Sequence, residues 1–230
     1  MSTQVLSHVD TRRWTAQRLA IWLAWAAVAA VAAYFWFTTI PKYFHYDRAH
    51  YIYYWPKRWW LIAHIGGGSL ALVTGLFQFS GAIRKRWPKV HRWTGRIYLL
   101  GVLVGSIGAV YLGLVVSPIR AFGISLEFLA LAWVLTSLMA YIAARRRQFA
   151  AHKEWMTRSY VVTFGFVLFR IGTRNHVLGN LGFQMQSVVL SWACWAVPLL
   201  ITDVVQRWRA TMGPVRRQPA AARLVGQPGR

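Results

Sequence analysis

Apolar stretches of about 20 residues alternate with short basic and aromatic connections along most of the chain. Because an α-helix rises 1.5 Å per residue, a stretch of this length spans the roughly 30 Å hydrocarbon core of a bilayer. The pattern therefore predicts an all-α membrane bundle of six transmembrane helices. We expect these helices at residues 18–40, 60–80, 94–116, 121–143, 156–174 and 187–206.

The basic residues predict the orientation of the bundle. If the N-terminus is cytoplasmic, 20 of the 27 Lys and Arg residues lie in cytoplasmic segments, six lie outside and Arg170 lies within a span. Lys and Arg concentrate in cytoplasmic loops, so we expect both termini inside. We divide the chain into a cytoplasmic N-terminal segment (1–17), a transmembrane domain (18–209) and a basic cytoplasmic tail (210–230). The Pro, Ala, Arg and Gly content of the tail predicts disorder.

Composition agrees with a membrane protein. The chain is 57% hydrophobic and 14% charged, whereas soluble domains carry about 25% charged residues. A net charge of +22 would suggest nucleic acid in a soluble protein. Here the charge lies between apolar segments, so it indicates topology and contact with anionic lipid, and no nucleic-acid partner is expected. The single cysteine, Cys194, lies in an apolar segment and is expected to be a small buried hydrophobe.

Small residues recur every four positions in two of the predicted spans. Such stripes let helix backbones approach closely in lipid. They predict close packing of these helices, and the same small residues would also leave room for a flat cofactor. The stripes are Gly67, Ala71 and Gly75 in one span, and Gly101, Gly105, Ala109 and Gly113 in the other.

A basic and aromatic signature occurs twice, each time where an apolar stretch begins. Both copies, residues 91–98 and 152–160, contain Trp-x-x-Arg-x-Tyr with a histidine two or three residues before the Trp. One interpretation is a shared site at one membrane surface for something flat or anionic. The other is that Trp, Tyr, Arg and His anchor the helices at the interface.

Histidines followed by a glycine one helical turn later suggest haem ligation. His64 has Gly68 at i+4, and His91 has Gly95 at i+4. In haem-binding helices the imidazole reaches the iron while a small residue leaves room for the porphyrin. The topology offers one cytoplasmic-side histidine pair, His91 with His152, and one outer pair, His64 with His176. His176 lies beyond the expected end of its helix, which favours His91 and His152 as ligands of a haem b iron.

Two charged residues lie within predicted spans at similar depth. Glu127 is near the outer end of the fourth span, and Arg170 is in the outer half of the fifth. An isolated charge is costly in a bilayer, so we expect a Glu127–Arg170 ion pair. The alternative is that Arg170 holds a carboxylate such as a haem propionate while Glu127 carries a proton. Asp203, near the inner end of the sixth span, is expected to be solvated.

The outer segment 41–60 is rich in aromatic residues and histidine. It is interpreted first as an interfacial belt, since Trp and Tyr favour the membrane–water boundary. The alternative is a lid over an outer pocket for a quinone-like or metal substrate. His45 and His50, with only Asp47 between them as an acidic ligand, form a poor metal motif. The chain has no nucleotide-binding glycine loop, no serine nucleophile elbow and no His-Glu-x-x-His motif.

Four sequence segments resemble an uncharacterised family of bacterial multi-pass membrane proteins, the domain of unknown function 2306. The resemblance covers about residues 60–172 and implies a protein of the bacterial inner membrane. The six-helix layout, with histidines near both faces, is also similar to transmembrane di-haem b-type cytochromes, although the fourth span here has no histidine. The segments are 64–68 through 75–79, 84–88, 91–98 and 152–160 through Arg170.

Two functional hypotheses follow. In the first, the protein is a b-type haem or quinone-binding redox protein that exchanges electrons with quinone or another redox protein. His91 and His152 would ligate haem iron, Arg96 and Arg158 would meet propionates or a quinone headgroup, and His64 and Arg170 would mark an outer site. In the second, the protein is not an enzyme but binds a lipid, a small molecule or a protein partner, and these residues anchor it at the interface.

Overall fold

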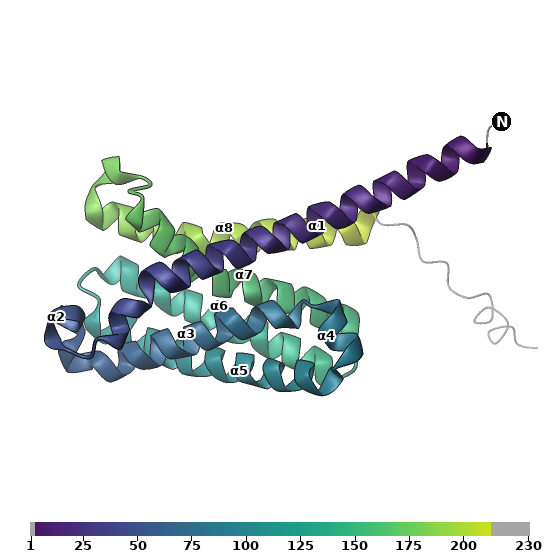
Figure 1. The fold of residues 1–230 in the computed structure, drawn as a ribbon. Coiled ribbons are helices and arrows are strands. Elements are labelled where there is room, and N and C mark those ends of the chain that lie inside the picture. The colour runs from purple at the N-terminus through teal and green to yellow at the C-terminus, as the bar shows by residue number, and fades with distance from the viewer. Residues whose placement is uncertain (1–2, 213–230) are drawn as a thin grey trace, which may run out of the picture.

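The computed structural model describes residues 3–212, with side chains described from Leu19 onward, and all regular secondary structure in this part of the chain is helical (Figure 1). Most of the predicted disordered tail, from residue 213 onward, lies outside the described residues. The long helices are α1 (Thr3–Thr39), α3 (Arg58–Gln78), α5 (Pro88–Tyr111), α6 (Arg120–Arg145), α7 (Phe149–Arg174) and α8 (Gly182–Met212). The short helical segments are η1 (Pro41–Phe44), α2 (Arg48–Tyr51), η2 (Ile52–Lys57), α4 (Gly81–Arg86), η3 (Leu112–Val116, a π-helical turn) and η4 (Gly179–Leu181).

Each predicted span falls on one of the long helices, which confirms the all-α fold. Most of the helices extend beyond the apolar stretches at one or both ends because their polar flanking residues continue the helix. Within the described residues, five helical segments are long and apolar enough to cross a membrane: Leu19–Thr39, Arg48–Gln78, Pro88–Val116, Arg120–Arg145 and Gly179–Met212. Helix α7 is as long as α6 but less apolar, since it carries five charged residues: Lys153, Glu154, Arg158, Arg170 and Arg174.

The helices run back and forth and bring the connections together at two ends of the bundle (Figure 1). We call one end the aromatic end, which contains residues 40–57, 112–119 and 175–181. We call the other the basic end, which contains residues 79–87 and 146–148. At the aromatic end, the Asp47 side chain caps α2 by accepting a hydrogen bond of 2.9 Å from the His50 backbone N–H, and this bond lowers the pKa of the Asp47 carboxyl.

Helices α3 and α5 pack backbone to backbone along their small-residue stripes. A Cβ atom on Gly67 would lie 2.6 Å from the Gly101 carbonyl oxygen, and one on Gly108 would lie 2.7 Å from the Trp60 carbonyl oxygen. Both distances are shorter than any real contact of a Cβ atom, so these positions require glycine. The predicted close packing is confirmed, and Gly108 extends it beyond the predicted stripes.

A buried hydroxyl network connects α5, α6 and α7. The Tyr98 hydroxyl lies 2.6 Å from Ser159 Oγ and 2.9 Å from Thr163 Oγ1, and Trp133 donates its indole N–H to Thr163 at 2.7 Å. Ser137 lies 2.7 Å from Ser159 on the other side. Because unpaired polar groups are costly in an apolar core, these mutual bonds fix how the three helices meet.

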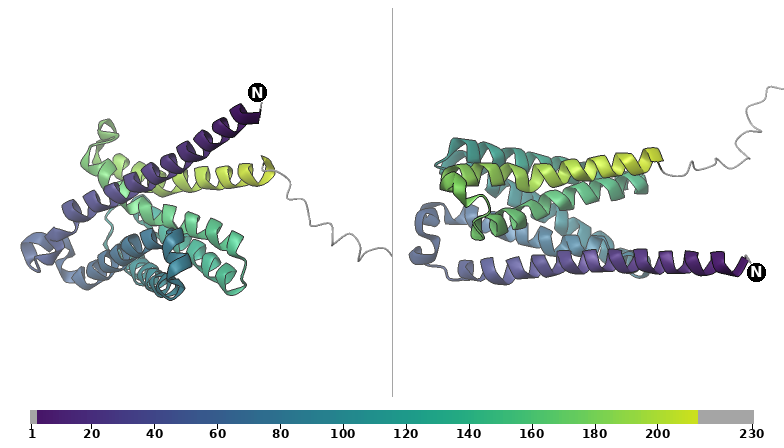
Figure 2. Two further views of the ribbon diagram at one scale, coloured as in Figure 1. Left: turned by 45° about the vertical axis from the view of Figure 1, so that its right-hand side comes forward. Right: turned by 90° about the horizontal axis from the view of Figure 1, so that it is seen from above.

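Helices α1 and α8 lie outside the group formed by α3, α5, α6 and α7 (Figure 2). Helix α8 packs mainly on α7, while α1 contacts α7 and α3 less extensively. Only 6% of the span Leu19–Thr39 is buried inside the protein. Helix α1 is therefore the least integrated of the long helices whose side chains are described.

Candidate functional site

A cavity of about 160 Å³ lies at the aromatic end of the bundle, between α1, α3, α5, α6 and α7. Its walls are mainly apolar, as in small-molecule sites generally. The apolar lining includes Phe35, Leu61, Leu72, Phe122, Phe166 and Phe169. The polar side chains that line it are Thr39, Tyr43, Tyr54, His64, Ser69, Ser117, Thr163 and Arg170.

His64 projects from α3 into this cavity and is held by the neighbouring helix. Its Nδ1 atom lies 3.0 Å from the carbonyl oxygen of Gly105 on α5, and its ring stands edge-on to Phe166, with the ring centroids 5.1 Å apart. A carbonyl oxygen only accepts hydrogen bonds, so Nδ1 carries the proton. Among the described residues Nε2 has no hydrogen-bond partner, and it is the ring nitrogen that remains for a ligand.

Gly68 provides open space one turn after His64. A Cβ atom built at Gly68 would have no heavy atom within 4 Å, and the residue lines the cavity. Gly66 has equally open surroundings but is exposed and does not line the cavity. The space expected beside His64 from the His-x-x-x-Gly spacing therefore exists.

Arg170 and Tyr54 bring polar hydrogen atoms to the cavity. Both line it, Arg170 from α7 and Tyr54 from η2. Neither the guanidinium nor the Tyr54 hydroxyl forms a hydrogen bond or ion pair with another residue in the part of the chain that is described. Arg170 is an exposed residue of α7 at the edge of the cavity, where its guanidinium can meet a ligand.

The predicted Glu127–Arg170 ion pair is wrong. The nearest cation to Glu127 is Arg120, with Nη1 and Oε1 4.0 Å apart, and no ion pair joins Glu127 to Arg170 among the described residues. Glu127 lies on the face of α6 that meets η3, since Gly113 is its neighbour there, whereas Arg170 lines the cavity and contacts α1. Glu127 and Arg170 were predicted to pair because of their similar depth, but they lie on helix surfaces that do not face each other.

The histidines of the basic end have a different environment. The His152 Nδ1 atom lies 2.9 Å from the Ala140 carbonyl oxygen, and His91 Nδ1 is buried without a partner among the described residues. Gly95, expected to leave room for a flat cofactor, instead accommodates Gln78: a Cβ there would lie 3.2 Å from Gln78 Oε1. Gln78 donates to Thr94 Oγ1 at 2.7 Å and so fills the space beside His91.

In both copies of the Trp-x-x-Arg-x-Tyr signature, the signature residues make contacts within the protein: the arginine stacks on the tryptophan, and the tyrosine forms buried hydrogen bonds. Each arginine stacks on the tryptophan of its own copy, Arg96 on Trp93 at 5.0 Å and Arg158 on Trp155 at 4.8 Å. Each tyrosine enters the core: Tyr98 joins the hydroxyl network, and Tyr160 donates to the Leu72 carbonyl at 3.1 Å. The sequence offered interfacial anchoring as one interpretation of these residues, but the buried partners of the tyrosines lie on other helices, and no local signal identifies them.

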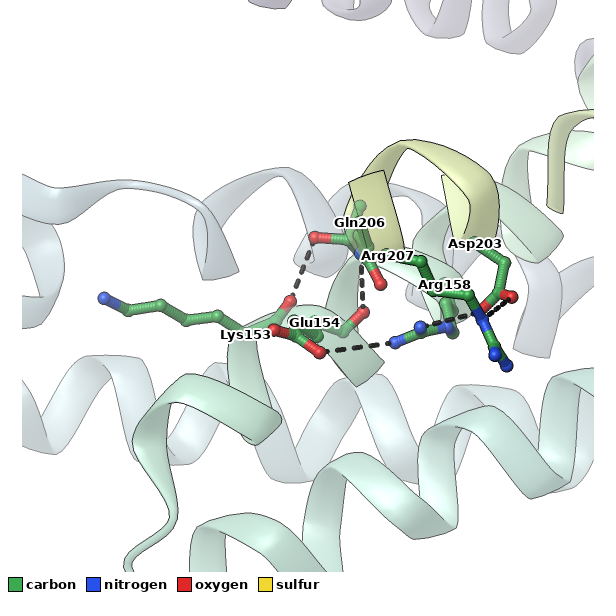
Figure 3. A network of polar contacts seen from close by, with 7 residues as sticks. Lys153, Glu154, Arg158, Asp203, Gln206 and Arg207 are labelled. Atoms are coloured by element: carbon green, nitrogen blue, oxygen red, sulfur yellow. Dashed lines mark hydrogen bonds and ion pairs between the residues drawn. The ribbon is translucent and has the colours of Figure 1, made fainter. Parts of the chain in front are cut away.

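Arg158 also connects α7 to α8. It donates to Asp203 Oδ1 at 2.8 Å, and Arg207 donates to Asp203 Oδ2 at 2.6 Å (Figure 3). Glu154 lies 3.9 Å from the same arginine. Asp203, expected to be solvated, is thus bound by two arginines, and the Arg158 side chain is only 12% exposed. The group predicted to meet a propionate is already engaged by the protein.

Other sequence-predicted positions do not join a site. His176, the proposed partner of His64, lies in the turn after α7 and does not line the cavity. Among the side chains that the structure describes, from Leu19 to Met212, no group of three His, Cys, Asp or Glu could hold a metal ion. Tyr43 and Tyr54, by contrast, come from the aromatic segment and line the cavity, which favours the lid interpretation of that segment.

The family described as "Predicted membrane protein (DUF2306)" matches residues 61–206, which is more than half of the chain. The matched part begins in α3 and ends in α8, so it includes His64, Gly68 and Arg170 but not α1. No curated protein matches the chain, and no solved structure matches it. The resemblance to the family is therefore confirmed, while a similarity to b-type cytochromes is not shown.

Proposed function

The chain belongs to the DUF2306 family of predicted membrane proteins, and from this premise we propose that it binds the ring headgroup of a quinone-type lipid in the His64 cavity. The observation that carries the proposal is the cavity itself: an apolar, ring-sized space in which His64 Nε2, the Tyr54 hydroxyl and the Arg170 guanidinium are left without protein partners among the described residues. Few polar groups in an apolar pocket are what orients a small ligand.

The size of the cavity favours a single ring over a porphyrin. An engineered cavity of about 150 Å³ is large enough to bind benzene, and this cavity measures about 160 Å³. Sites for drug-sized ligands run from about 300 to 1,000 Å³. A haem, with four pyrrole rings, is too large for this space, whereas one substituted benzoquinone ring matches it.

The position of the cavity favours a ligand that comes from the bilayer. One wall is the peripheral helix α1, through Phe35, Thr39 and Ile40. That helix buries little of its surface against the bundle, so an apolar tail can pass beside it into lipid while the ring lies next to His64. Tyr43 and Tyr54 close the cavity at the aromatic end.

The proposal includes the finer topology. We place six spans, α1, α3, α5, α6, α7 and α8, in a bacterial inner membrane with both termini in the cytoplasm. The bias of Lys and Arg supports this orientation. Helix α7 is counted as a span despite its charges for two reasons. Its residue Arg158 is paired with Asp203, and the helix packs between α6 and α8. In this orientation the cavity lies in the outer half of the bundle.

A cavity-filling substitution tests the proposed function. The full-length protein in lipid nanodiscs is titrated with a short-chain ubiquinone analogue, and binding is followed by calorimetry. Gly68→Leu fills the cavity and is expected to weaken binding at least tenfold, whereas Gly66→Leu, on the exposed side of the same helix turn, leaves it unchanged. Equal binding by both variants and the wild type would contradict the proposal, and so would no binding by the wild type.

A haem at the basic end is the second candidate function. It is supported by His91, whose buried Nδ1 has no partner among the described residues, and by His152, whose Nδ1 is anchored so that Nε2 remains for iron. It is less well supported than the cavity because Gln78 occupies the space beside Gly95. A reduced-minus-oxidised absorption spectrum of the haem-supplemented protein tests this second function. A b-type band that is lost in His91→Ala and His152→Ala would establish the haem site, and a featureless spectrum would contradict it.

A further inference from the structure

We infer that His64 makes the cavity selective for a hydroxyl-bearing ring, a quinol or a related phenol, over the corresponding quinone. This inference rests on the proposed function and names the form of the ligand. The observation behind it is the hydrogen bond between His64 Nδ1 and the Gly105 carbonyl oxygen, 3.0 Å long. That bond determines which hydrogen-bonding group the His64 imidazole presents to the cavity.

The hydrogen bond fixes the tautomer of His64. The Gly105 carbonyl can only accept, so the proton is on Nδ1 and the neutral ring presents a lone pair at Nε2. Close packing of α3 and α5 holds the two groups together. At this point the helices are so near that a Cβ on Gly108 would lie 2.8 Å from the His64 backbone nitrogen. Nε2 is therefore a hydrogen-bond acceptor at a fixed place.

The chemistry of the two ligand forms differs at that acceptor. A quinol carries an O–H that can donate to Nε2, whereas a quinone offers only carbonyl oxygens, whose lone pairs would face that of Nε2. Elsewhere in the cavity Arg170 and Tyr54 supply donors for an oxygen on the ring. The cavity thus combines an acceptor without a proton, His64 Nε2, with donors on Arg170 and Tyr54, which suits a ring bearing a hydroxyl and a second oxygen.

A site that hydrogen-bonds a ligand hydroxyl discriminates against the analogue without it, because its own polar group is left unpaired. One such bond to a neutral group corresponds to about tenfold in affinity. We therefore expect the wild-type protein to bind the reduced form of a short-chain ubiquinone analogue about tenfold more tightly than the oxidised form. Both titrations are performed on full-length protein in nanodiscs, without oxygen for the reduced form.

His64→Asn separates the two functions of the ring. The asparagine Nδ2 lies where Nδ1 was and can still donate to the Gly105 carbonyl, so α3 and α5 stay connected, but no acceptor replaces Nε2. We expect the preference for the reduced form to fall to about one in this variant. His176→Asn, outside the cavity, is the matched control and should retain the preference.

The outcomes separate the inference from the proposed function. Equal affinity of the wild type for both forms, or a preference for the oxidised form, would overturn the inference while binding itself still supports the proposed function. Retention of the preference in His64→Asn would also overturn the assignment to His64. Binding of neither form by the wild type overturns both.

Discussion

At the residue scale, glycines determine where helices α3 and α5 pack closely and where α3 leaves space for the His64 cavity. Gly67 and Gly68 are adjacent in the sequence, yet Gly67 meets the backbone of α5 while Gly68 faces the cavity. The spacing of His64 and Gly68 predicted an open space correctly. The same spacing failed for His91 and Gly95, because the side chain that fills the space, Gln78, comes from another helix, and local spacing carries no information about it.

Substituting neighbouring glycines should have very different effects. In Gly67→Ala the new methyl group would collide with the Gly101 carbonyl oxygen and the Gly105 backbone, and the two helices would have to separate. We expect a loss of about 1–3 kcal/mol in stability, the usual cost of overpacking. Gly66→Ala has open surroundings within the same helix, and because alanine is the better helix former it should stabilise the protein by up to about 1 kcal/mol. Thermal unfolding of the detergent-purified variants measures the difference, and similar melting temperatures would show that α3 and α5 do not pack this closely.

At the element scale, α7 carries most of the polar contacts between helices. Its hydroxyls meet α5 and α6, Tyr160 bonds to the backbone of α3, and Arg158 binds Asp203 of α8. The hydrophobic pattern predicted where α7 lies in the chain but not that its polar residues face other helices. Of the two arginines of α7 that were assigned to a ligand, Arg158 binds Asp203, while Arg170 lines the cavity without a hydrogen bond or ion pair to another described residue.

The Arg158–Asp203 contact should contribute measurably to the attachment of α8. Asp203→Asn leaves Arg158, which is 12% exposed, with Glu154 at 3.9 Å as its remaining anionic neighbour. A charge-assisted hydrogen bond is stronger than a neutral one, but Asp203 is 31% exposed and partly screened by solvent, so we expect a small, measurable loss of stability. Arg207→Gln removes the exposed partner of the same carboxylate and should cost less. Chemical denaturation in mixed micelles compares the two variants, and an equal loss from both would contradict the dominant contribution of Arg158.

At the scale of the whole molecule, hydropathy and charge predicted the helices but not the cavity, because the cavity forms only where several helices pack together. Its walls come from five helices, and its polar groups are separated by more than a hundred residues in sequence, from Thr39 to Arg170. The aromatic segment looked like an interfacial belt because its composition is that of a belt. Only the fold shows that two of its residues, Tyr43 and Tyr54, also line the cavity.

The most direct test of the central claim, that the ligand occupies the His64 cavity, is photocrosslinking followed by peptide mass spectrometry. A short-chain quinone analogue that carries a photoreactive group on its ring is irradiated with the full-length protein in nanodiscs, with and without excess unlabelled analogue. We predict competable adducts within residues 61–72 of α3 and 163–170 of α7, which line the cavity. Competable adducts confined to the helix starts around His91 and His152 would place the site at the basic end and contradict the account.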